Sequence, residues 1–123
     1  MRVISKKKLV DFYESPNMER SKTPLQAWYQ IVSKIDWAGF ADVKKTFGAS
    51  VDLVGDCIVF DIHGNHFRLI TRLRFISGKV FILKVLTHKE YDKDSWKRDC
   101  GCFEAPPARQ VKKVSVLRKR KRD

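Results

Sequence analysis

The sequence predicts a single α+β domain, because helix-like and strand-like segments occupy separate halves of the chain. Apolar residues recur at helical spacing through residues 1–47. Alternating strands joined by short glycine-containing turns fill residues 52–87. The length of 123 residues fits one domain, and a hydrophobic content of 43% is enough for a core. We therefore expect two or three N-terminal helices packed on one face of an antiparallel sheet.

The N-terminal half contains a short strand, at residues 2–4, and three candidate helices. Ser5 is expected to cap the first helix. Thr23 and Pro24 are expected to cap and open the second, because proline is tolerated at the first helical position. A short third helix is expected over residues 40–47. The second helix has an apolar stripe spaced for one buried face: Leu25, Trp28, Ile31, Val32 and Ile35.

Three long strands with short turns, typical of an antiparallel meander, are expected over residues 57–63, 66–75 and 80–87. Because successive side chains point to opposite faces, alternation separates the residues that meet the helices from the rest. On the third strand Phe81, Leu83 and Val85 are expected to face the helices, and Ile82 to face away. The opposite, helix-free face then carries an excess of cationic side chains: Arg68, Arg72, Arg74, Lys84 and His88. We interpret this face as an open phosphate-binding surface, although a merely solvated strand face would also be polar.

The charge balance favours a polyanionic partner. Lys and Arg number 26 against 14 acidic residues, a formal net charge of +12, and each neutralised phosphate releases condensed counterions. General solubility is the alternative explanation. Residues 94–123 hold half of the surplus and end in a cationic run at 118–122, which is typical of a basic, disordered tail. We therefore place the folded domain at residues 1–96 and the tail at residues 97–123.

The three cysteines, Cys57, Cys100 and Cys102, stand in a chain whose start has no signal-peptide-like apolar stretch. No apolar run approaches the roughly 20 residues that span a bilayer. We therefore expect a reduced cytoplasmic protein with free thiols and no membrane association. The cysteines fall short of the four ligands of structural zinc, and His63 and His66 on one turn are a weak metal site. No metal or cofactor is expected.

The last long strand ends beside two groups that can move protons, His88 and Tyr91. RNA cleavage needs a base for the 2′-hydroxyl, an acid for the departing 5′-oxygen and cations for the dianionic transition state. Histidine titrates near neutrality and serves in either proton role. A single His and Tyr at a strand end are more often structural, but the basic face beside them favours a metal-independent RNA-cleaving site.

Six motifs, in order over residues 1–93, carry a family resemblance: Met1-Arg2-Val3-Ile4-Ser5-Lys6-Lys7, Leu25-Gln26-Ala27-Trp28-Tyr29, Ala41-Asp42-Val43-Lys44, Val59-Phe60-Asp61-Ile62, Gly64-Asn65-His66-Phe67-Arg68-Leu69 and Thr87-His88-Lys89-Glu90-Tyr91-Asp92-Lys93. Together they resemble the HigB toxins of bacterial type II toxin–antitoxin modules. The resemblance implies a RelE-like fold and an mRNA endonuclease, often acting in the ribosomal A site, that a helix-turn-helix antitoxin holds inactive. It also implies catalytic roles by motif position for Arg68, Lys84, His88 and Tyr91.

On the basic face, RNA contacts are expected from Arg68, Arg72, Arg74 and Lys84. A non-catalytic RNA- or ribosome-binding module is the principal alternative, because the same face would dock RNA without cutting it. A DNA-binding protein of the helix-turn-helix class is less favoured. Its recognition helix would carry base-reading side chains, whereas the exposed basic residues here are expected on strands.

Overall fold

Five strands form one sheet in the order β1-β5-β4-β3-β2 in the computed structural model, which describes residues 1–103. The strands are β1 (Arg2–Ile4), β2 (Val51–Val54), β3 (Cys57–Ile62), β4 (Phe67–Arg74) and β5 (Lys79–Thr87). β1 runs parallel to β5, and the other neighbouring strands are antiparallel. The predicted N-terminal strand and the predicted meander of β3, β4 and β5 are both confirmed.

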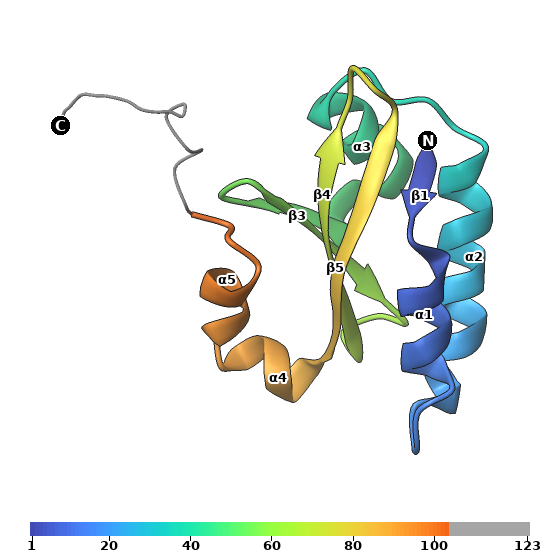
Figure 1. Ribbon diagram of the computed structural model, residues 1–123, viewed down its shortest axis with the longest axis vertical. Coiled ribbons are helices and arrows are strands. Elements are labelled where there is room, and N and C mark those ends of the chain that lie inside the picture. Colours follow the sequence, from blue (N-terminus) through green and yellow to red (C-terminus); the bar gives the residue numbers. More distant parts are fainter. Residues whose placement is uncertain (104–123) are drawn as a thin grey trace, which may run out of the picture.

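Five α-helices flank the sheet in the described part of the chain: α1 (Lys6–Tyr13), α2 (Lys22–Ser33), α3 (Phe40–Phe47), α4 (His88–Asp92) and α5 (Ser95–Asp99). α1 and α2 lie on one side of the sheet, and α4 and α5 on the other (Figure 1). The three N-terminal helices were predicted. α2 nevertheless begins two residues early, with Ser21 at its N-cap. Pro24 is accommodated because the first four backbone N–H groups of a helix have no partner within it.

The main core lies between the three N-terminal helices and the sheet. Phe60 of β3 is at its centre, with its ring edge-on to Trp28 at 5.3 Å and to Phe47 at 5.0 Å between centroids. The part of the α2 stripe that is buried consists of Leu25, Trp28 and Val32. Ile31, predicted in the same stripe, is 46% exposed. The buried face of α2 is therefore narrower than the sequence pattern indicated.

β5 contains a β-bulge at Leu83. Thr71 of β4 pairs with Ile82 and Ile70 pairs with Lys84, so Leu83 has no partner on β4. Val80 and Ile82, before the bulge, are buried in the main core. The prediction that Phe81 and Leu83 face the helices and Ile82 faces away is wrong. The prediction assumed unbroken alternation along the strand, and the extra residue at the bulge shifts the residues before it by one position, to the opposite face. Val85, after the bulge, packs against the main core as predicted.

A second apolar cluster lies on the opposite face of the sheet, which we call the outer face. Its buried members are Cys57, Val59, Ile70, Leu86, Trp96 and Cys102. α4, α5 and the residues after α5 supply its cover (Figure 1). The prediction of a helix-free face is therefore wrong: α4 and α5 have five residues each, too few for helical periodicity to be visible.

The expected domain boundary after Trp96 falls inside α5. Residues 97–103, which were expected in the tail, instead complete α5 and the segment that follows it. The expected disorder of residues 104–123 lies outside the described residues. Among residues 1–103, no helix is long and apolar enough to cross a membrane.

A disulfide bond joins Cys57 on β3 to Cys102, and both side chains are fully buried. Cys100 is the free cysteine and is half-buried. The prediction of three free thiols is therefore wrong for two of them. The backbone N–H of Asp56 also donates to the Cys102 carbonyl at 2.6 Å, and a Cβ atom on Gly55 would collide with that carbonyl oxygen. These contacts hold residues 100–103, which we call the strap, against β3.

Candidate functional site

The predicted site residues divide into two groups on the outer face. Arg68 of β4 lies with His88 and Tyr91 of α4 at one end, whereas Arg72 and Lys84 lie near the strap. His88 lies four positions after Lys84 along the chain, about 13 Å in extended strand. Arg74, the last residue of β4, is exposed and pairs with Lys79 at the far end of the sheet. The structure therefore brings together three of the four predicted catalytic residues and places Lys84 apart.

Arg68 is the buried centre of the first group, with 8% of its surface exposed. Its Nε lies 3.0 Å from Oδ1 of Asp61, its partner on β3, and its Nη1 donates to the carbonyl of Asn65 at 2.8 Å. The guanidinium carbon also lies 4.7 Å from the centre of the Tyr91 ring, a cation–π arrangement. Arg68 is thus not the open side chain that strand alternation led us to expect. It is fixed beneath Tyr91.

The ion pair between Asp61 and Arg68 is partly removed from water. Burial raises the pKa of Asp61 above its usual value of 3.8, and the positive charge of Arg68 opposes that rise. The charge of Arg68 is therefore partly balanced by Asp61 whenever that carboxyl is ionised.

α4 is held at both ends of its single turn. At its start, Thr87 and Glu90 form a capping box, in which each side chain accepts a hydrogen bond from the other residue's backbone N–H. Toward its end, the Tyr91 ring stacks on Trp96 at 5.0 Å between centroids, and Trp96 Nε1 donates to the Tyr91 carbonyl at 2.9 Å. Trp96 is buried in the second cluster. The position of Tyr91 is therefore set by α5 as well as by α4.

His88 is exposed at the first position of α4, with its Nε2 3.3 Å from Oδ2 of Asp92. Its backbone N–H donates to the His66 carbonyl at 3.0 Å. The His66 ring in turn lies 4.9 Å from the His63 ring. In the described part of the chain, no group of three or more metal-ligating side chains converges. Sequence reasoning weighed His63 and His66 only as metal ligands, although extending the β4–β5 pairing would have placed His66 beside His88.

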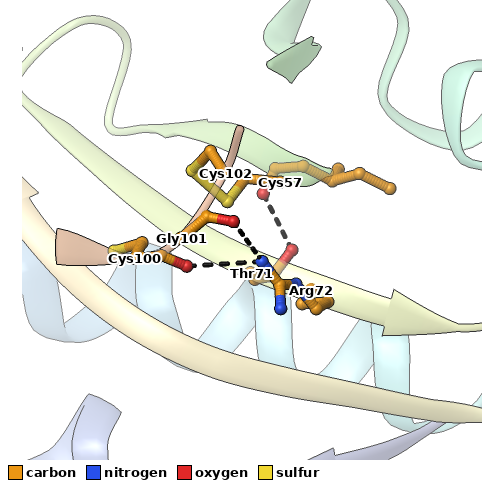
Figure 2. The surroundings of a disulfide bond; sticks show 7 residues. Cys57, Thr71, Arg72, Cys100, Gly101 and Cys102 are labelled. Carbon is orange, nitrogen blue, oxygen red and sulfur yellow. Dashed lines mark hydrogen bonds between the residues drawn. A yellow bond between two sulfur atoms is a disulfide. The ribbon is translucent and has the colours of Figure 1, made fainter. Parts of the chain in front are cut away.

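The second group, Arg72 and Lys84, lies near the strap. Arg72 Nη2 donates to the Gly101 carbonyl at 2.7 Å and more weakly to the Cys100 carbonyl at 3.4 Å (Figure 2). Arg72 Nε is buried without a hydrogen-bond partner. Lys84 is exposed, with its Nζ 3.8 Å from Oδ2 of Asp99. Burial raises the pKa of the Cys100 thiol, and the nearby Lys84 opposes the rise. The strap therefore occupies Arg72 but leaves Lys84 accessible.

A family model described as HigB_toxin, the RelE-like toxic component of a toxin–antitoxin system, matches residues 21–94. That span covers more than half of the chain and includes both groups of site residues on β4, β5 and α4. The chain belongs to the HigB toxin family. Membership confirms the RelE-like fold that the sequence motifs indicated, and it makes this chain the toxin component of a toxin–antitoxin system with an antitoxin as its partner. No curated protein matches the chain.

The HigB family match ends at Asp94. α5 and the strap, including Cys102, lie beyond it. The residues of the first group therefore lie within the family match, whereas Trp96 of α5, which helps to position Tyr91, and the cover over Arg72 lie outside it.

Proposed function

We propose that this HigB-family toxin is a metal-independent endoribonuclease that cleaves mRNA on cytoplasmic ribosomes and is neutralised by a helix-turn-helix antitoxin. One observation carries the proposal. A single helical turn, α4, presents two groups capable of proton transfer, His88 and Tyr91, beside the fixed positive charge of Arg68. The ribose supplies its own nucleophile, so this chemistry needs proton transfer and charge stabilisation from the protein.

The proposed roles follow the geometry. His88 and Tyr91 share proton transfer, and Arg68 fixes the Tyr91 ring and contributes positive charge from below. Lys84 is about 13 Å along the strand from His88, so it suits a flanking phosphate better than the reacting one. Arg74 is exposed and suits a further phosphate contact. Arg72 contacts phosphate only if the strap carbonyls release its guanidinium.

The rival proposal is a non-catalytic RNA- or ribosome-binding module. It rests on the exposed cations Lys84 and Arg74, which would dock a phosphate backbone whether or not the α4 groups transfer protons. The two proposals differ in what α4 does. Substitutions on α4 that leave the exposed cations intact therefore separate them.

The test is cleavage of labelled mRNA, free and on programmed ribosomes, by the wild type and by His88→Ala and Tyr91→Phe. Removing a group that transfers a proton in the transition state is expected to slow cleavage about 10²- to 10⁴-fold. Lys89→Ala is the matched control, because Lys89 is an exposed residue of the same helix, and it should cleave like the wild type. Growth arrest on expression should follow the same order. Binding without cleavage in both settings would favour the non-catalytic module.

A further inference from the structure

We propose that His66 is a second catalytic residue, paired with His88 so that one imidazole acts as base and the other as acid on single-stranded RNA. This inference rests on the proposed endoribonuclease function and deepens it. It replaces Tyr91 with His66, at the start of β4, as the partner of His88 in proton transfer, and it leaves Tyr91 to pack over Arg68. Sequence reasoning placed His66 on the sheet face opposite the helices but weighed its chemistry only as that of a metal ligand.

The strand register places the two histidines opposite each other. Phe67 and Thr87 are partners in the β4–β5 ladder, so the next pair outward is His66 and His88. The 3.0 Å hydrogen bond from the His88 N–H to the His66 carbonyl joins the two backbones at that position, while the His66 N–H donates to the His63 carbonyl in the turn. Directly opposed residues have Cβ atoms about 4.5–5.5 Å apart and share a face. That face is the outer one, because His66 lies two residues from Arg68.

The side chains at this end of the sheet differ in their exposure to solvent. Both His66 and His88 are exposed, whereas Arg68 beside them is buried. A ribose and its phosphate can therefore approach the two imidazoles directly, with the guanidinium fixed behind them. Within residues 1–103, no ion pair involves His66, while Asp92 lies 3.3 Å from the Nε2 of His88. Asp92 can accept a hydrogen bond from the protonated His88 ring and orient it.

This asymmetry assigns the two roles. We assign the base role to His66, whose ring pairs with no carboxylate in the described residues, and the acid role to His88, whose ring Asp92 can hold in one orientation through a hydrogen bond from Nε2. His66 removes the proton of the 2′-hydroxyl as the 2′-oxygen forms its bond to phosphorus. The bond from phosphorus to the 5′-oxygen breaks, and His88 protonates that leaving oxygen. The products are a 2′,3′-cyclic phosphate and a 5′-hydroxyl, with no other reactant consumed.

The experiment is the pH dependence of kcat/KM for a labelled single-stranded RNA, free or on programmed ribosomes, in full-length wild type, His66→Gln and His88→Gln. One base and one acid give the wild type a bell-shaped profile. His66→Gln is expected to lose about 10²- to 10⁴-fold at the optimum and the limb that rises with pH, and His88→Gln the limb that falls. His63→Gln is the matched control, because His63 flanks the same turn one strand farther from His88, and it should keep the wild-type profile.

Three outcomes would overturn the assignment. If the wild type cleaves RNA and His66→Gln has the same rate and pH profile, His66 is not the base, and the proposed endoribonuclease function is unaffected. If His63→Gln and His66→Gln lose kcat/KM equally, the effect comes from disturbing the turn and not from removing one imidazole. Loss of wild-type cleavage in a chelator, restored by Zn²⁺, shows that the histidines act through a metal. His66→Ala regaining activity in added imidazole supports the assignment even if the rate loss is partly structural. Absence of cleavage by the wild type in both settings overturns the proposed function itself.

Discussion

Replacing Cys102 with serine tests how strongly the disulfide fixes the strap on the outer face. The bond links residues with a sequence separation of 45. Closing a loop of that length restricts the unfolded chain enough to stabilise the fold by about 4 kcal/mol in the chain-entropy description. For a domain of this size, that loss corresponds to a fall in Tm of roughly 15–30 °C. Reduction of the wild-type protein removes the same constraint and should lower Tm to a similar extent.

Thermal unfolding followed by circular dichroism, with and without a reducing agent, measures the effect. Cys100→Ser is the matched control, because Cys100 is the free thiol and its replacement leaves the loop closed. The denatured, unreduced wild type should show one titratable thiol. Three titratable thiols, or a Tm that does not respond to reduction, would refute the reasoning.

Four further substitutions test the core, the Asp61–Arg68 pair, the exposed Lys84 and the covered Arg72. Phe60→Ala should lower the free energy of unfolding by about 3–5 kcal/mol in urea denaturation, because Phe60 contacts three aromatic rings. Burial raises the pKa of Asp61, so near that pKa the folded state binds more protons than the unfolded state. The free energy of unfolding of the wild type, relative to that of Asp61→Asn, should therefore fall as pH rises through the pKa. Identical pH dependences for the two proteins would contradict this. Lys84→Ala should reduce the slope of log RNA affinity against log salt by about 0.7, whereas Arg72→Ala, whose guanidinium the strap holds, should leave the slope unchanged.

Most of the elements that the sequence predicted correctly have many residues in a regular pattern; the three-residue β1 is the exception. Helical periodicity marks α1, α2 and α3, and alternation or flanking turn residues mark β2, β3, β4 and β5. The six motifs indicated the family. The β-bulge at Leu83 escaped prediction because one extra residue leaves the run of apolar residues intact while shifting its alternation.

The cover of the outer face depends on contacts between residues far apart in the chain. α4 and α5 are too short for periodicity, and the pairing of Cys57 with Cys102 depends on a distance in space that sequence spacing does not give. The same holds for the site. The sequence analysis grouped Arg68, Lys84, His88 and Tyr91, and the structure places Lys84 apart from the other three. The burial of Arg68 against Asp61 depends on the α4 cover. The proximity of His66 to His88 follows from strand register.

The central claim is that α4 and the neighbouring end of the sheet cut RNA by activating the ribose 2′-hydroxyl. The chemistry of the RNA ends tests it most directly, measured by mass spectrometry after purified toxin is incubated with mRNA, free and on programmed ribosomes, in the presence of a chelator. We expect a 2′,3′-cyclic phosphate on one fragment and a 5′-hydroxyl on the other. Fragments ending in a 3′-hydroxyl and a 5′-phosphate, or RNA that stays intact while bound, would contradict the claim.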